Sequence, residues 1–179
     1  MKSDKYLIRQ FKKGKAEAFS QIYQHYVERI YRFVFLKTLS KEESEDITSQ
    51  VFCRLLEYLV GSSKKIKSLQ AFLYRVARNL VNDFYRKQGK WGKELALEEE
   101  KEIVDDNLKI EEKIDQKLTL EGIKSALENL NDNYKDIIIL YYLEELSVKE
   151  IADIMEKSEG AVRVLIHRAL KELRRKLNQ

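Results

Sequence analysis

Proline is absent from this sequence of 179 residues, and glycine occurs only six times. Proline breaks helices and both residues mark turns, so their scarcity favours a nearly all-helical chain with short connections. The single cysteine, Cys53, excludes an intramolecular disulfide. Because Cys53 lies in an apolar helical stretch, we interpret it as a small helix residue in a reducing compartment rather than as a nucleophile.

Common catalytic and metal-binding motifs are also missing. The two histidines, His25 and His167, lie far apart, and no Cys/His cluster offers zinc ligands. There is no glycine-rich phosphate loop and no Gly-x-Ser-x-Gly elbow. An enzyme is therefore the least favoured class, and nothing calls for a cofactor. The N-terminus lacks the apolar core of a signal peptide and no apolar run could span a bilayer, so we expect a soluble, cytoplasmic protein without membrane insertion.

The first half of the chain carries apolar residues at helical spacing. Its 44% hydrophobic content is enough for buried cores. A short helix near residues 4–13 is expected first, and Ser40 to Glu43 predicts a capping box that opens a later helix. We predict a four-helix domain over residues 1–93. Three apolar stripes form its core: Phe19, Ile22, Tyr23, Tyr26, Ile30 and Phe33; Ile47, Val51, Leu55 and Leu59; and Leu69, Phe72, Leu73, Val76, Ala77, Leu80 and Phe84.

The character of the sequence changes between residues 94 and 117. Acidic residues are frequent there, aromatic residues are missing, and apolar residues are scattered. Such a segment fits a flexible linker or a partly helical acidic connector. We predict an acidic linker over 94–117, with a helix resuming near Ile110.

Residues 118–179 predict a second small helical domain that ends in a helix-turn-helix. Ser147 to Glu150 is a capping box that opens a short helix, and Ser158 is the expected N-cap of the last helix. The residues expected to face the core are Leu120, Ile123 and Leu127; Tyr134, Ile137, Ile138 and Tyr141; Ile151, Ala152 and Met155; and Val162, Ile166, Ala169 and Leu173.

Charged residues are unevenly distributed along the sequence, with two basic stripes and one acidic helix. The stretch 64–93 holds nine Lys and Arg residues against Asp83 alone. Arg75, Arg78, Asn79, Asn82 and Arg86 share one face of the helix expected there, and guanidinium groups interleaved with amides suit phosphate and base-edge contacts. Nearby aromatic residues could stack on unpaired bases, although a solvated basic face over core aromatics fits equally well. These aromatics are Phe72, Tyr74, Phe84, Tyr85 and Trp91.

The last helix is basic too: from Arg163 to Lys176 it holds six Lys and Arg residues and one acid, Glu172. Its terminal cations could merely complement a helix C-terminus. Arg163 and Arg168 lie in the first half, where a helix-turn-helix meets the major groove, so DNA contact is the better interpretation for these two. The helix at 43–60 is instead acidic and would repel DNA, which suits a basic protein partner.

Three segments resemble the sigma-70 family of transcription initiation factors. Residues Glu45 to Phe52, Glu-Asp-Ile-Thr-Ser-Gln-Val-Phe, resemble region 2.2, which binds core RNA polymerase. Residues Phe72 to Asn79, with Asp83 and Arg86, resemble region 2.3–2.4, which melts and reads the −10 element. Residues Leu146 to Ala152, followed by Gly160 to Arg163 and His167 to Ala169, resemble region 4.2, which reads the −35 element. The length and two-domain plan resemble the extracytoplasmic-function (ECF) group.

The resemblance implies three sets of site residues. Contacts to core polymerase fall to Glu45, Asp46, Gln50 and Phe52. Contacts to the −10 element fall to Lys64, Lys65, Phe72, Tyr74, Arg75, Arg78, Asn79 and Arg86, with the loop 62–67 as the rim of a pocket for a flipped base. Contacts to the −35 element fall to Ser158, Arg163, His167, Arg168 and Lys171.

The helix-turn-helix departs from the family pattern. Its turn is Glu156-Lys157 rather than glycine and an apolar residue, which predicts a looser turn or a longer first helix. Ala161 and Leu165 stand where Thr and Arg are common, so −35 contact is expected to be weaker or more shape-driven. An ordinary helix-turn-helix regulator remains the main alternative, and a helical adaptor the next. The sequence leaves open the promoter and whether an anti-sigma protein binds.

Overall fold

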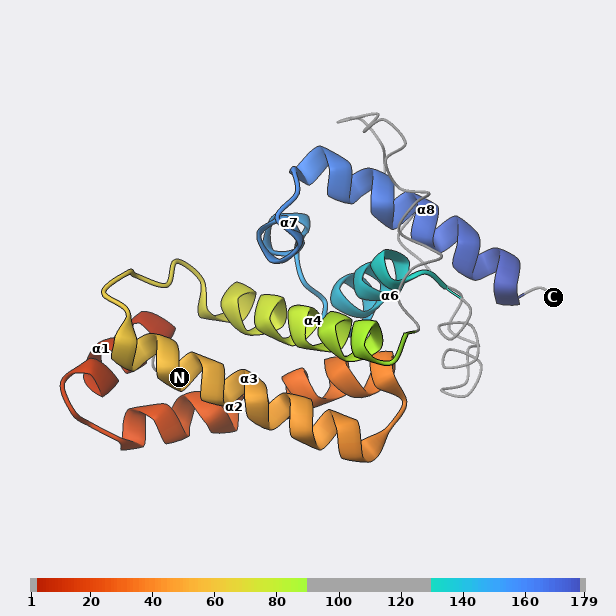
Figure 1. The fold of residues 1–179 in the computed structure, drawn as a ribbon. Helices are drawn as coiled ribbons and strands as arrows, with labels where there is room; N and C mark the ends of the chain where they lie inside the picture. The colour runs from red at the N-terminus through yellow and green to blue at the C-terminus, as the bar shows by residue number, and fades with distance from the viewer. Residues whose placement is uncertain (1–2, 90–129, 178–179) are drawn as a thin grey trace. The chain divides into compact units, whose positions relative to one another are not determined.

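The computed structural model describes residues 3–89 and 130–177, and these form two helical units divided after Gln88 (Figure 1). The segment 94–117, the apolar face at Leu120, Ile123 and Leu127, and Trp91 lie outside the described residues. All regular secondary structure in the described ranges is helical, so the predicted all-α class is confirmed.

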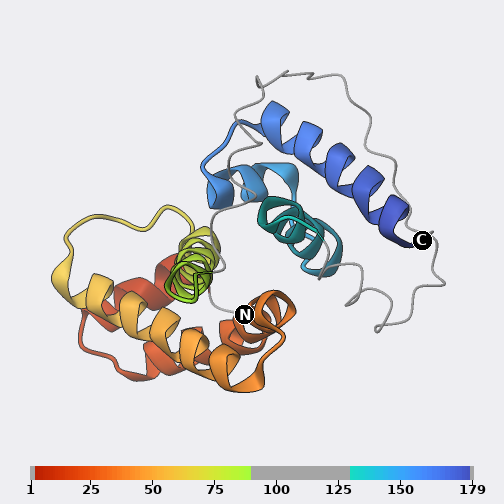
Figure 2. The same cartoon turned by 45° about the vertical axis from the view of Figure 1, so that its right-hand side comes forward.

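The first unit contains α1 (Asp4–Lys12), α2 (Glu17–Thr38), α3 (Lys41–Gly61) and α4 (Leu69–Lys87). Helices α2, α3 and α4 each pack against the other two, and α1 packs mainly on α2 (Figures 1 and 2). Apolar residues spaced by three and four fill the centre, as the pattern predicted. The residues with no exposed surface include Ile22, Ile30, Phe33, Val51, Leu55 and Leu73.

Serine side chains begin three of these helices. Ser3, Ser40 and Ser68 each accept a hydrogen bond from the backbone N–H three residues on, which satisfies one of the free donors of a helix N-terminus. The capping box predicted at Ser40 is only half formed. The Ser40 N–H donates to Thr38 Oγ1 at 3.4 Å, so Thr38 takes the place expected for the Glu43 carboxylate.

Two apolar stripes differ from the prediction. Tyr23 is 43% exposed, because it sits at the edge of α2 beside Phe52 instead of under α3. On α4 the buried face is rotated toward Ala71, Tyr74 and Val81. The predicted core residues of α4 that are consequently only half-buried are Phe72, Val76, Leu80 and Phe84.

The second unit contains α6 (Asp132–Ile138), a π-helical turn η2 (Ile139–Leu143), α7 (Val148–Met155) and α8 (Glu159–Leu177). Helix α8 packs against α6 and α7 (Figure 2). The core faces predicted for α7 and α8 are both buried, with Val162, Ile166 and Ala169 fully covered. The π-helical turn widens the helix and shifts its register, so Ile139 and Leu140 are buried while Tyr141 is only half-buried. Tyr134, which precedes the turn in α6, is also only half-buried.

The turn between α7 and α8 is tight, which corrects the expectation of a looser turn or a longer first helix. Helix α7 ends at Met155, and Glu156 adopts the left-handed conformation with φ 57° and ψ 39°. The Lys157 N–H then donates to the Ala152 carbonyl at 3.1 Å. Glycine usually occupies such a position because a side chain makes left-handed backbone costly. Glu156 therefore makes the turn that glycine normally makes.

Candidate protein- and nucleic-acid-binding surfaces

The N-terminal half of α3 presents an exposed acidic face. Asp46 and Gln50 lie one helical turn apart, and the Gln50 Nε2 donates to the Asp46 Oδ2 at 2.6 Å. Glu45 is also exposed and lies 3.8 Å from the Lys41 ammonium. The hydrogen bond between Asp46 and Gln50 holds both side chains ready at the surface, so a partner meets an acceptor and a donor in fixed positions.

Phe52 does not belong to this exposed face, which corrects its assignment to the polymerase-contacting residues. Only 4% of Phe52 is exposed, and its ring centroid lies 4.7 Å from that of Tyr23. Helical geometry explains this placement, because a residue six positions after Asp46 points away from the Asp46 side of the helix. Phe52 supports α3 from within the core.

A groove of about 520 Å³ runs between the C-terminal half of α3 and the middle of α4. The rings of Tyr58 and Phe72 meet across it with centroids 4.9 Å apart. Val76 and Leu80 add apolar wall, whereas Asn79 and Asp83 supply polar groups. The rest of the lining consists of Arg54, Glu57, Gly61 and Ser62. An apolar cavity with a few polar groups at its edge is the usual form of a ligand site.

The structure places the predicted −10 residues in different environments. Phe72 and Asn79 line the groove, whereas Tyr74 is fully buried with its ring edge-to-face on Phe33 at 5.4 Å. Tyr74 therefore cannot reach DNA, which corrects its assignment, because the rotated core face of α4 includes it. Arg75 and Arg78 are half-buried on the polar side of α4.

Arg86 and the loop lysines are exposed. The Arg86 Nη2 donates to the Asp83 Oδ1 at 2.7 Å, which partly neutralises its charge. Lys64 and Lys65 lie on the loop after α3, where the Lys64 N–H donates to the Ser62 Oγ at 3.1 Å. Ser62 also lines the groove, so the basic loop begins at its rim.

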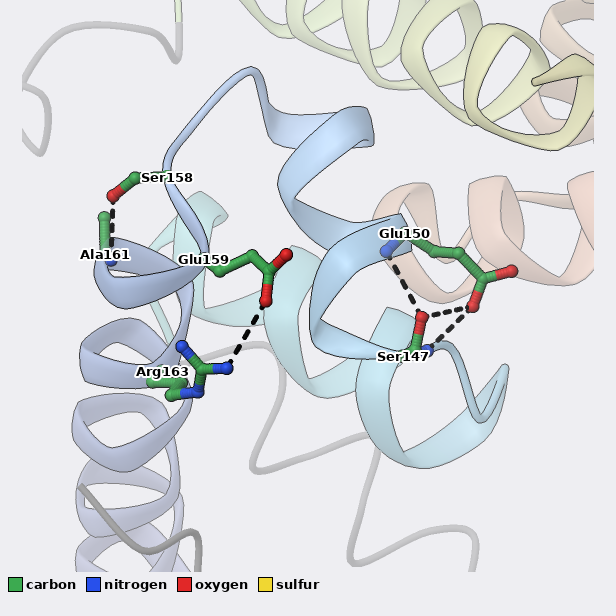
Figure 3. A network of polar contacts seen from close by, with 6 residues as sticks. All are labelled: Ser147, Glu150, Ser158, Glu159, Ala161 and Arg163. Carbon is green, nitrogen blue, oxygen red and sulfur yellow. Dashed lines mark hydrogen bonds and ion pairs between the residues drawn. The ribbon is translucent and has the colours of Figure 1, made fainter. Parts of the chain in front are cut away.

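The helix-turn-helix is built on two caps (Figure 3). At the start of α7, Ser147 and Glu150 form the predicted capping box: the Glu150 N–H donates to Ser147 Oγ at 3.3 Å, and the Ser147 N–H donates to Glu150 Oε2 at 2.9 Å. Ser158 Oγ accepts from the Ala161 N–H at 3.1 Å and begins α8. These caps fix the residue at which each helix starts, and the start of α8 determines which of its residues face solvent.

That exposed face carries the predicted −35 residues. Arg163, His167 and Lys171 are spaced by four and share one side of α8, with the half-exposed Arg168 beside them. The Arg163 Nη2 lies 3.3 Å from the Glu159 Oε2 (Figure 3). Ser158 is exposed, but its side-chain oxygen is already engaged as the N-cap. Nearer the C-terminus, a hydrogen bond from Arg175 lowers the pKa of Glu172.

Two residues of the candidate sites, Glu159 and Tyr58, were not predicted from the sequence. Glu159 pairs with Arg163 at the i, i+4 spacing, and that spacing would have predicted the contact. Tyr58 forms a wall of the groove, but its sequence neighbours give no sign that α4 passes next to it. Among residues 3–89 and 130–177, no cluster of His, Cys, Asp or Glu could hold a metal ion. No helix in those ranges is both long and apolar enough to cross a membrane.

Both units match family models of sigma-70 factors. The model described as Sigma-70 region 2 matches residues 22–90, and the one described as Sigma-70, region 4 matches residues 120–173. The two matched regions identify the class of protein as a transcription initiation factor of the sigma-70 type.

Relatives make the assignment more specific. The chain is 32% identical to the ECF RNA polymerase sigma factor SigW of Bacillus subtilis, over 95% of this chain and 94% of that protein. It is 30% identical to the ECF RNA polymerase sigma factor BldN of Streptomyces coelicolor, where the match covers 96% of this chain but 64% of the longer protein. The chain therefore spans slightly less than two thirds of BldN. It belongs to the ECF group of the sigma-70 family.

Solved structures share the fold at lower identity. CnrH in complex with the cytosolic domain of CnrY superposes with a TM-score of 0.73 at 20% identity, over 98% of this chain and 97% of that one. The sigma factor RpoE in complex with the anti-sigma factor NepR from Bartonella quintana gives 0.65 at 22% identity, over 91% and 98%.

Proposed function

We propose that this chain binds core RNA polymerase through α3, captures unpaired −10 DNA in the groove between α3 and α4, and reads the −35 element with α8. Residues 1–93 would supply the first two activities and residues 118–179 the third, with 94–117 as their connection. The observation that carries the proposal is the groove, because an ordinary helix-turn-helix regulator has no use for it.

The groove has the chemistry that an unpaired base needs. The half-buried Phe72 and Tyr58 rings provide apolar surface, and stacking on such rings is worth about 1–3 kcal/mol per base. Asn79 is exposed at the groove edge, where its amide can both donate to and accept from a base edge. The cations nearby can hold the backbone. Duplex DNA hides its base faces, so such a groove favours melted DNA.

The acidic face of α3 is the proposed contact with polymerase. Asp46 and Gln50 are exposed and form a hydrogen bond with each other, so replacing them removes no core packing. We expect the Asp46→Ala/Gln50→Ala variant to weaken core binding by about 2 kcal/mol or more while its unfolding is unchanged. The matched control is Gln24→Ala/Glu28→Ala, which removes an exposed amide and acid at the same spacing on α2.

Run-off transcription with reconstituted core polymerase tests the function as a whole. The wild-type chain should direct specific initiation, bind duplex promoter DNA poorly alone, and bind it well with polymerase. Tight, specific duplex binding by the chain alone, together with no transcription and no core binding, would identify an ordinary regulator instead.

An anti-sigma protein is a proposed further partner. One of the similar solved structures is a sigma factor, RpoE, in complex with an anti-sigma factor, NepR. A protein that covers the Asp46 face of α3 would block the proposed polymerase contact directly. We expect the anti-sigma protein and core polymerase to compete for the wild-type chain. The same competition is expected for the Gln24→Ala/Glu28→Ala control variant.

A further inference from the structure

A second pocket, which we call the α1–α3 pocket, lies on the other side of the end of α3. It has a volume of about 510 Å³, within the usual range of small-ligand sites. Its lining is Phe11, Lys12, Gly14, Ala16, Leu59, Val60, Gly61, Ser62 and Ser63. Gly61 and Ser62 line this pocket and also the groove between α3 and α4. The two cavities are therefore neighbours at one helix end.

Part of the wall of the α1–α3 pocket is apolar, and the core does not use all of this apolar surface. Phe11 is half-buried, with its ring centroid 5.5 Å from that of Phe19. Val60 is 75% exposed, compared with 43% for Tyr23 and 40% for Leu56. An aromatic ring that is held in place and an uncovered aliphatic side chain give a flat base something to pack on.

The rim of the α1–α3 pocket is strongly basic. The Lys12 Nζ donates to the Ser62 carbonyl at 3.0 Å, which ties the end of α1 to the loop after α3. This contact brings together lysines from two separate segments, residues 12–15 and 64–67. The acidic residue nearest to either segment in the sequence is Glu17. The exposed lysines flanking the lining residues are Lys12, Lys13, Lys15, Lys64, Lys65 and Lys67. Such a cluster favours a polyanionic occupant.

We propose that the α1–α3 pocket is a second nucleotide site, which takes an unpaired base adjacent to the one in the groove and holds its phosphates with the surrounding lysines. The proposal rests on the proposed function, because it extends the single strand from the groove across Gly61 and Ser62. A single strand supplies both a base for the apolar part of the wall and phosphates for the surrounding lysines, and the two cavities share Gly61 and Ser62.

Fork-junction DNA bound to reconstituted holoenzyme tests the proposal. A series of templates carries a non-template strand that is extended one nucleotide at a time from the −10 base, in each direction. We expect one added nucleotide to raise wild-type affinity about tenfold, because stacking and phosphate contacts begin together. The Lys13→Ala/Lys64→Ala variant should lose this gain, and its salt slope should fall by about 1.4, at about 0.7 per phosphate.

Two further variants separate the proposal from general charge effects. Val60→Glu puts a carboxylate on an exposed wall of the α1–α3 pocket, so it should remove the gain without unfolding the protein, and 2-aminopurine at the added position should lose its quenching. Lys5→Ala/Lys149→Ala removes two exposed lysines elsewhere and should keep the gain on templates that lack a −35 element.

The outcomes distinguish this site from the groove. If the shortest template binds normally but no added nucleotide gives a step, or if the Lys13/Lys64 variant keeps the full gain, the second site is refuted and the groove stands. Loss of core binding in that variant would also refute it, since the lysines would then be contacting polymerase. If the shortest template does not bind to wild-type holoenzyme, the proposed function fails first.

Discussion

Helices α4 and α8 have the same sequence design but use it differently. Each has an apolar stripe and a basic stripe, yet all four predicted core residues of α8 are buried, whereas α4 buries Leu69, Leu73 and Ala77 and leaves Phe72, Val76 and Leu80 half-exposed. Helix α4 has more apolar residues than its core needs. The surplus lines the groove, so excess apolar surface on a packed helix marks where a ligand can bind.

The largest expected effect separates the two aromatic residues of α4. Tyr74→Ala should destabilise the first unit by about 3–5 kcal/mol, because it empties a fully buried site against Phe33. Phe72→Ala should cost only about 1–2 kcal/mol, because Phe72 is half-buried, and should weaken binding of −10 single strand instead. Urea unfolding paired with oligonucleotide titration of holoenzyme measures both. Equal stability losses would break the contrast between core and groove.

The corresponding test on α8 concerns recognition. Arg163→Ala should weaken −35 binding by about 1–3 kcal/mol if its guanidinium reads a guanine edge, and by less if it touches only phosphate. Glu159→Gln should strengthen binding several-fold, because it removes the carboxylate 3.3 Å from Arg163 and frees that cation for DNA. Holoenzyme titrations against promoters with and without the −35 element give the numbers. An unchanged affinity in both variants would remove Arg163 from the DNA face.

A smaller effect is expected at the turn of the helix-turn-helix. Glu156 holds φ at 57°, a conformation that costs a residue with a side chain about 1 kcal/mol more than glycine. We expect Glu156→Gly to stabilise the second unit by up to about 1 kcal/mol in thermal unfolding, with Glu156→Val destabilising it. A destabilised glycine variant would mean that contacts of the Glu156 side chain outweigh the backbone cost.

The smallest effect is expected at Tyr142, within the π-helical turn. Its hydroxyl is buried without a hydrogen-bond partner among the described residues, and burial raises its pKa to about 12. Because the unfolded phenol ionises near pH 10, this group's stabilising contribution is complete below that pH and is lost as the pH rises toward 12. Tyr142→Phe should be neutral or stabilising by about 1 kcal/mol. It should also remove this group's loss of stability between pH 10 and pH 12. A clear loss of stability at pH 7 would contradict this.

Helical periodicity predicted the all-α class and the core faces of α3, α7 and α8, because each is set by residues three and four apart. The environment of Tyr74 could not be predicted in the same way. Phe72 and Tyr74 are aromatic residues two positions apart on α4, and only the positions of α2 and α3 decide which one is covered. The π-helical turn was missed for a related reason, since Ile137 to Leu140 read equally well as continuous α-helix.

The acidic surface of α3 shows what a local sequence motif can and cannot predict about side-chain exposure. Asp46 and Gln50 emerged together on one exposed face, as expected from their spacing of four. Phe52 belongs to the same motif by resemblance, yet it packs in the core. The motif therefore combines exposed residues, which we propose contact polymerase, with a buried residue that holds the helix in place, and burial distinguishes the two kinds.

Permanganate footprinting of a cognate promoter with reconstituted holoenzyme tests the central claim most directly. Asn79→Ala/Arg78→Ala changes the edge and flank of the groove and leaves the Asp46 face untouched. We expect this variant to bind core polymerase normally, to lose thymine reactivity in the −10 region, and to recover transcription on a pre-melted bubble template. A variant that opens the duplex as well as wild type, with no advantage from the bubble, would show that the groove between α3 and α4 does not capture the melted strand.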